Sequence, residues 1–129
     1  MRIRVYYEDT DCGNVVYYAN YLRYMERSRT EYLRERGVDL SDYHENGLLF
    51  TVTEAHLHYR APARYNDLLD VASSIIEITP VTINFMTEIR RSGESNLLVK
   101  GEVRVACIRT NGRPTRIPEE MRKALSSNR

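Results

Sequence analysis

One long helical pattern followed by a succession of strand-like segments is the feature that most restricts the fold of this chain. Residues 17–36 place apolar side chains at helical spacing, and Gly37 follows as a residue that favours a helix end. After residue 48 the pattern changes to strand-like segments separated by turn-forming residues: Leu49–Tyr59, Leu68–Ile78, Thr82–Arg91 and Leu97–Ile108. One helix and a run of strands joined by short turns predict an α+β fold, with a meandering antiparallel sheet packed on the helix.

Shorter elements flank this pattern. Residues 2–9 are expected to form a strand, residues 39–46 a short helix or turn, and Pro118 the first position of a last helix. The polar tail after Leu125 is expected to fray. A chain of 129 residues without a linker-like segment predicts a single domain over residues 1–129.

The overall composition excludes several functional classes. The formal net charge is +1, which gives no electrostatic case for nucleic acid as a partner. No stretch approaches the ~18 apolar residues of a membrane span, and the first residues lack the apolar run of a signal peptide. The two cysteines, Cys12 and Cys107, match no metal-binding spacing. A reducing cytoplasm is therefore the expected location.

An acidic turn lies between the first strand and the long helix. Asp9-Thr10-Asp11 is followed by Gly13 and Asn14, two residue types that tolerate positive φ. A carboxylate in a turn that leads into a helix lies beside unpaired backbone N–H groups, an arrangement suited to acyl transfer. Judged by itself, however, Asp11 more often forms an Asx-turn or caps a helix.

The same stretch carries a family resemblance. The run from Tyr7 to Tyr21, together with Met25–Glu31, resembles the 4-hydroxybenzoyl-CoA thioesterase-like group of hotdog proteins. Within that group, the small acyl-CoA thioesterases associated with the Tol–Pal system are the most similar. Related segments occur at His58–Ala63, at Asp67 and Leu69, and at Gly112–Pro118. The resemblance implies a hotdog fold, in which an antiparallel β-sheet wraps around one long central helix.

The resemblance also implies an activity. Such a protein hydrolyses the thioester of a small acyl- or aroyl-CoA to the free acid and CoA. Asp11 would act as general base or nucleophile, and the backbone N–H of Tyr18 would polarise the substrate carbonyl. Family members have His or Tyr at this position, and with Tyr18 the mechanism rests on the carboxylate without an imidazole. No metal or redox cofactor is expected, and coenzyme A enters only as part of the substrate.

Other residues are expected to surround the substrate. Relatives usually have Gly where this chain has Asn14, and they carry a basic run where it has Thr79-Pro80-Val81. The phosphates of CoA must then meet other arginines. Those that could do so are Arg60, Arg64, Arg90, Arg91, Arg113 and Arg116, and Arg113 and Arg116 are the candidates chosen among them. The full set of expected substrate-binding residues is Gly13, Asn14, Tyr17, Tyr21, His58, Tyr59, Arg113 and Arg116.

Several alternatives stay open at this stage. Cys12 is a rival nucleophile in the same turn, although no histidine is near it in the sequence. His56 and His58 alternate on one strand and resemble a pair of metal ligands, although a structural role is more common. The fold also occurs in non-catalytic proteins, so an acyl-CoA or acyl-carrier binding or scaffold subunit is the alternative function. A hydratase would want a His beside the acidic turn and is least favoured.

The curved sheet also predicts self-association. A single sheet leaves an edge strand with unpaired backbone groups, which a second copy can cover. In the hotdog family the active site usually lies between two subunits. A homodimer or homotetramer is therefore expected.

Overall fold

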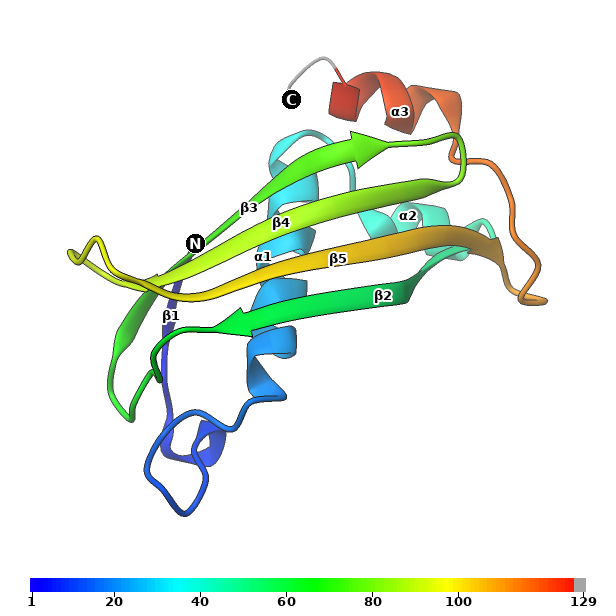
Figure 1. Cartoon of the computed structure of the whole chain (residues 1–129). Helices are drawn as coiled ribbons and strands as arrows, with labels where there is room; N and C mark the ends of the chain where they lie inside the picture. The colour runs from blue at the N-terminus through cyan, green and yellow to red at the C-terminus, as the bar shows by residue number, and fades with distance from the viewer. Residues whose placement is uncertain (127–129) are drawn as a thin grey trace.

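The computed structural model describes residues 1–126 and shows an antiparallel five-stranded sheet curled around one long helix (Figure 1). The strands are β1 (Arg2–Arg4), β2 (Leu48–Tyr59), β3 (Leu68–Ile78), β4 (Thr82–Arg91) and β5 (Leu97–Arg109), arranged in space as β1-β3-β4-β5-β2. The helices are α1 (Asn20–Glu35), α2 (Leu40–Glu45) and α3 (Glu119–Ser126). This is the hotdog arrangement that the sequence predicted. The part of the predicted frayed tail from residue 127 onward lies outside the described residues.

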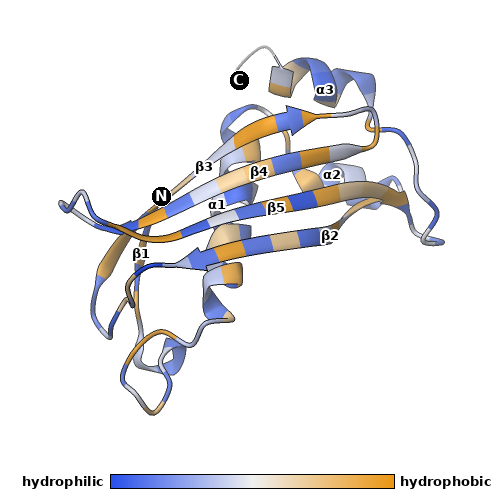
Figure 2. Ribbon diagram, viewed as in Figure 1, coloured by the Kyte–Doolittle hydropathy of each residue, from blue (hydrophilic) through white to orange (hydrophobic). Residues whose placement is uncertain are grey.

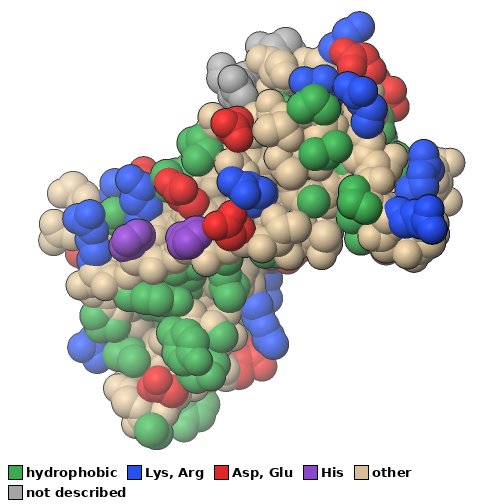
Figure 3. Space-filling view, turned by 45° about the vertical axis from the view of Figure 1, so that its right-hand side comes forward, with side chains coloured by type: hydrophobic (Ala, Val, Ile, Leu, Met, Phe, Trp, Pro, Cys, Tyr) green, Lys and Arg blue, Asp and Glu red, His purple; other side chains and the backbone are tan. Residues whose placement is uncertain are grey.

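The core lies between α1 and the concave face of the sheet. The buried stripe of α1 consists of Tyr21, Tyr24, Met25, Ser28, Tyr32 and Leu33. Alternate residues of β4 and most alternate residues of β5 face this stripe, and both strands carry hydrophobic and hydrophilic residues along their length (Figure 2). On the opposite face, charged side chains and histidines form a band (Figure 3). The sheet therefore has one apolar face on the helix and one polar outer face.

The first predicted strand is shorter than expected. β1 ends at Arg4, and Tyr7–Asp9 form a 3-10 turn instead of continuing the strand. The Asp9 carboxylate accepts a hydrogen bond from the Tyr6 N–H (2.9 Å), while the Asp9 N–H donates to the Tyr6 carbonyl (3.0 Å). These local bonds outweigh the β propensity of the two tyrosines.

The expected meander is correct only for β3, β4 and β5. β2 pairs with β5 rather than with β3, so the chain must cross one end of the sheet between them. Residues 60–67, here called the crossing segment, make this connection, and Asn66 within it has a φ of 71°. The two hairpins turn within a few residues, whereas the crossing segment is long enough to pass the ends of the other strands. It brings the chain next to the acidic turn, since the Val16 N–H donates to the Ala63 carbonyl (2.9 Å).

One edge of the sheet is formed by a long strand. β2 is the long edge strand, and most of its residues are exposed. Within residues 1–126, none of the helices is both long and apolar enough to cross a membrane.

Candidate active site

The acidic turn is a tight hairpin closed by its own backbone. Thr10 and Val16 form a β-bridge, and the Asp11 N–H donates to the Val15 carbonyl (2.9 Å). The Asn14 N–H donates to the Asp11 carbonyl (3.0 Å), and Asn14 has a φ of 64°. Asn14 thus adopts a left-handed conformation, as its tolerance of that conformation predicted. The departure at this position leaves the turn intact.

The Asp11 carboxylate is fixed through one oxygen. Its Oδ1 accepts a hydrogen bond from the Gly13 N–H (2.8 Å), which is an Asx-turn. A Cβ at position 13 would lie 3.2 Å from the same oxygen, so glycine leaves room for the carboxylate. Within the described chain, Oδ2 has no hydrogen-bond partner, and the residue is exposed. Asp11 therefore has one oxygen held in place and one available for chemistry.

The N-terminus of α1 is left without a cap. Its N-cap residue is Ala19, which has no side-chain acceptor, and the first turn contains no acidic residue. The Asn20 N–H donates to the Tyr17 carbonyl (2.8 Å). Among residues 1–126, the N–H groups of Tyr18 and Ala19 have no acceptor. Unpaired N–H groups at the positive end of a helix suit the oxygen of a carbonyl that gains negative charge.

These groups open into one cleft, here called the Asp11 cleft. It has a volume of about 320 Å³, and Asp11, Tyr18, Tyr21, Tyr59 and Arg60 are among the residues that line it. The rings of Tyr21 and Tyr59 have centroids 5.6 Å apart, and the Tyr59 hydroxyl donates to the Tyr18 carbonyl (3.3 Å). The cleft thus combines a carboxylate, unpaired N–H groups and aromatic walls.

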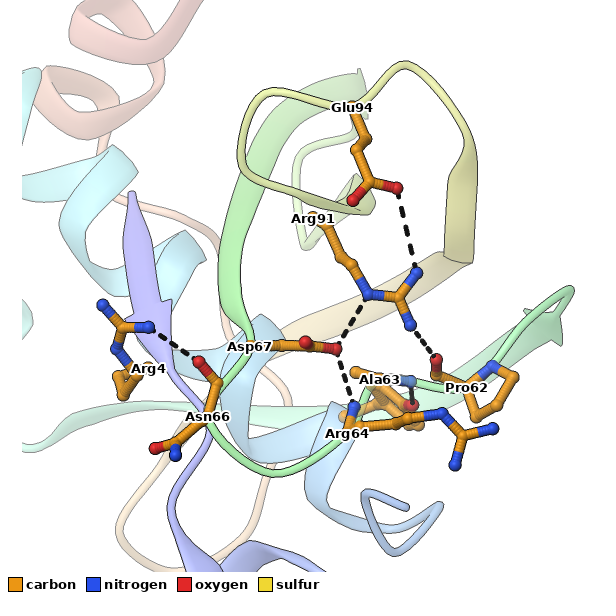
Figure 4. Close-up of polar contacts among 9 residues, drawn as sticks. Arg4, Pro62, Ala63, Arg64, Asn66, Asp67, Arg91 and Glu94 are labelled. Atoms are coloured by element: carbon orange, nitrogen blue, oxygen red, sulfur yellow. Dashed lines mark hydrogen bonds and ion pairs between the residues drawn. The ribbon is translucent and has the colours of Figure 1, made fainter. Parts of the chain in front are cut away.

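The crossing segment forms one wall of the Asp11 cleft, and an ion pair holds it (Figure 4). Arg91, at the end of β4, donates through Nε to the Asp67 carboxylate (2.8 Å) and through Nη2 to the Pro62 carbonyl (2.7 Å). The same Asp67 oxygen accepts from the Arg64 N–H (2.8 Å). The sequence marked Asp67 as part of the resemblance and Arg91 as one of several arginines that could meet CoA. It did not predict their contact, because that contact depends on how the strands pair.

Tyr21 connects this wall to the helix. Its hydroxyl oxygen accepts a hydrogen bond from the Ala63 N–H (3.0 Å), and its ring is buried. Burial raises the pKa of the Tyr21 hydroxyl, so the group stays protonated at neutral pH. Tyr21 is therefore a neutral support of the cleft.

The other expected substrate-binding residues lie at different distances from the Asp11 cleft. Tyr17 is exposed next to it, with its ring centroid 4.7 Å from that of Tyr18. His58 lies on the outer face of the sheet. Arg113 and Arg116 lie beyond the far end of β5, so the length of β2, about 36 Å, separates them from Tyr59 within one chain. This chain alone therefore does not bring those arginines to Asp11.

The rival residues are also placed by the structure. Cys12 is exposed with a free thiol, but it is not among the residues that line the Asp11 cleft. His56 lies 3.1 Å from Glu54, measured between Nε2 and Oε1. Among the described residues, no group of three or more His, Cys, Asp or Glu side chains is arranged to hold a metal ion.

Comparison with known proteins finds similar chains along most of the sequence. The acyl-CoA thioesterase YbgC of Haemophilus influenzae is 39% identical over 125 residues, covering 95% of this chain and 90% of that protein. The acyl-CoA thioester hydrolase YbgC of Escherichia coli is 38% identical over 106 residues, covering 82% and 78%. The crystal structure of the hypothetical protein TT1821 from Thermus thermophilus superposes with a TM-score of 0.92 at 33% identity, covering 98% and 96%. The model of the thioesterase-like superfamily matches residues 5–125, and the chain belongs to that family.

Proposed function

We propose that this protein is an acyl-CoA thioesterase, which hydrolyses the thioester of a small acyl- or aroyl-CoA to the free acid and CoA. The observation that carries the proposal is the Asp11 cleft. It is lined by the Asp11 carboxylate, of which one oxygen is held by the Gly13 N–H, and by Tyr18 at the uncapped start of α1. The acyl-CoA thioesterase YbgC of Haemophilus influenzae aligns with 95% of this chain. Both the site and the relatives favour the same reaction.

The proposed reaction uses the two sides of the Asp11 cleft together. The thioester carbonyl oxygen accepts a hydrogen bond from the Tyr18 N–H, which stabilises the negative charge of the tetrahedral intermediate. Asp11 Oδ2 either attacks the carbonyl carbon or removes a proton from a water that attacks it. The C–S bond then breaks, and CoA leaves as a thiolate that takes up a proton. In the first route, water hydrolyses the acyl-carboxylate anhydride that remains. Neither route needs a metal or redox cofactor.

The test is thiol release from short-chain, long-chain and aromatic acyl-CoAs by the wild type and by Asp11→Asn. The amide oxygen of Asn can still accept the Gly13 N–H, so the turn should survive while the reactive oxygen is lost. We expect a loss of about 10²-fold or more in kcat. Glu8→Gln is the matched control, because it removes an exposed carboxylate from the same region.

Two results would contradict the proposal. Equal release by wild type and Asp11→Asn would show that the carboxylate is not used, and Cys12→Ala would then show whether the thiol replaces it. Saturable binding of acyl-CoA without thiol release would instead favour the non-catalytic binding or scaffold subunit.

We also propose that the protein is a homo-oligomer, with a dimer as the smallest unit. β2 is a long edge strand, and Val52 and Tyr59 on it are each 49% exposed. Pairing of β2 with its copy would cover these side chains and satisfy the free backbone groups of the edge. Light scattering at micromolar protein should give the mass of a dimer or tetramer, and a monomer would contradict the proposal. We place the protein in the cytoplasm, where the free thiols of Cys12 and Cys107 stay reduced.

A further inference from the structure

A second cleft lies on the outer face of the sheet, on the side away from α1. It has a volume of about 360 Å³ and is lined by His56, His58, Arg60, Lys100 and Glu102. In Figure 3, histidine, basic and acidic side chains lie side by side on this face, above an area of hydrophobic side chains. We call it the outer cleft. Its lining is polar and mostly basic, unlike that of the Asp11 cleft.

The register of β2 and β5 builds the outer cleft. His58 lies opposite Lys100, and His56 lies opposite Glu102. Successive residues of a strand point to opposite faces, so the histidines point outward while Leu57 between them packs against the core. The outer cleft is therefore a fixed consequence of strand pairing rather than a chance meeting of mobile side chains.

Its cations are not neutralised by ion pairs. Glu54, the nearest carboxylate along β2, contacts His56 at 3.1 Å and Arg104 at 2.8 Å. By contrast, across residues 1–126 neither Arg60 nor Lys100 forms a salt bridge, and Glu102 is the one carboxylate in the lining. Two unpaired cations with adjacent imidazoles are suited to a phosphate group.

Arg60 connects the outer cleft to the Asp11 cleft. Arg60 lines both clefts and directly follows the last residue of β2. Its N–H and that of Ala61 both donate to the Leu98 carbonyl, which fixes the backbone at this point. From Arg60 back to His56 the strand spans about 13 Å. The pantetheine arm of CoA is roughly as long as four extended residues, or about 14 Å. Counted from Arg60, which lines the Asp11 cleft, an arm of this length extends along the whole outer cleft as far as His56.

We propose that the outer cleft binds the phosphate groups of coenzyme A, with Arg60 and Lys100 as the main cationic contacts and the pantetheine arm passing around the end of β2. This inference rests on the proposed thioesterase function and specifies how its substrate is held. Within one chain these two cations lie nearer to the Asp11 cleft than Arg113 and Arg116, which lie at the other end of the sheet.

The test compares two substrates with the same acyl group, acyl-CoA and acyl-pantetheine, of which the second has no phosphate. The readout is the ratio of their kcat/KM values. For Lys100→Gln and for Arg60→Gln we expect this ratio to fall roughly fivefold, through KM for acyl-CoA. Glu102→Gln should raise the ratio, because it removes the carboxylate that repels phosphate. Added salt should lower the ratio for the wild type and much less for Lys100→Gln.

Arg109→Gln is the matched control, since it removes one exposed cation from the opposite end of β5. Thermal unfolding of each variant checks that the fold is kept. An unchanged ratio in both Lys100→Gln and Arg60→Gln overturns the proposal, as does a ratio that falls only in Arg113→Gln or Arg116→Gln. Hydrolysis of acyl-pantetheine by the wild type reports the thioesterase function independently, so failure of the subsite and failure of the activity give different results.

Discussion

The two ends of α1 are built in opposite ways. At the C-terminal end, Gly37 has a φ of 82°, its N–H donates to the Arg34 carbonyl (3.0 Å), and the Val38 N–H donates to the Leu33 carbonyl (2.9 Å). This is a complete Schellman motif, and the side chains of Val38 and Leu33 are buried in the same core cluster. At the N-terminal end, Ala19 offers no cap and the first turn carries no acid.

We attribute this difference to the proposed function of the N-terminal end of α1. A capping side chain is typically worth ~1 kcal/mol, and the chain lacks it where the Asp11 cleft opens. An uncapped helix start is a cost in folding, but it keeps a carboxylate away from the Tyr18 N–H, the proposed oxyanion donor.

Ala19→Asp is expected to have the largest effect, because it adds a cap to the uncapped end of α1. A carboxylate at the helix start should stabilise the protein by about 0.5 kcal/mol through the helix dipole. The same charge should repel the developing oxyanion beside the Tyr18 N–H, so we expect kcat to fall about 10²-fold. Thermal unfolding and thiol release measured on one preparation give both numbers.

Ala19→Asn is its matched control, with similar size and no charge. It should lose much less activity than Ala19→Asp. Full activity in Ala19→Asp would show that the start of α1 is not where the substrate carbonyl binds.

A change at the C-terminal end of α1 should lower stability and leave activity unchanged. In Gly37→Ala, a Cβ enters a left-handed conformation, which costs about 1 kcal/mol. We expect the Tm to fall by about 4 °C with kcat and KM unchanged. A lower kcat in Gly37→Ala, beside the lower Tm, would show that the capped end of α1 also affects activity.

The smallest effect is expected for Tyr59, whose hydroxyl contacts the chain just before the uncapped end of α1. Tyr59→Phe keeps the ring beside Tyr21 but removes the hydroxyl that donates to the Tyr18 carbonyl. That bond orients the peptide between Tyr18 and Ala19, so its loss should lower kcat about threefold with little change in KM. Tyr65→Phe, at an exposed tyrosine outside the Asp11 cleft, serves as the control and should change neither value.

Local patterns predicted the elements better than their connections. The bounds of β3 and β4 match the sequence prediction, because each alternates between two faces and is closed by turn residues. The 3-10 turn at Tyr7–Asp9 was missed because one carboxylate overrides the propensity of its neighbours. The crossing segment was read only as a break, since nothing local indicates that β2 pairs with β5.

In the site too, local contacts could be predicted from the sequence and long-range contacts could not. Asp11, Gly13 and Asn14 belong to one short turn, so their proximity was visible in the sequence. The partnership of Arg91 with Asp67 and the placement of Lys100 opposite His58 each join residues from distant parts of the chain. Such contacts follow from strand register, which hydrophobic periodicity alone does not determine.

The pairing of β2 with β5 also has a consequence for the order of folding. Leu48 pairs with Arg109 and Tyr59 with Val99, so this edge closes across a much longer loop than the hairpins do. Long loops carry a larger entropic cost and form late. Because Tyr59 and Arg60 complete the Asp11 cleft, the chain can regain most of its sheet before it regains its catalytic geometry. In a refolding experiment, recovery of thiol release should therefore lag behind recovery of the β-sheet circular dichroism signal.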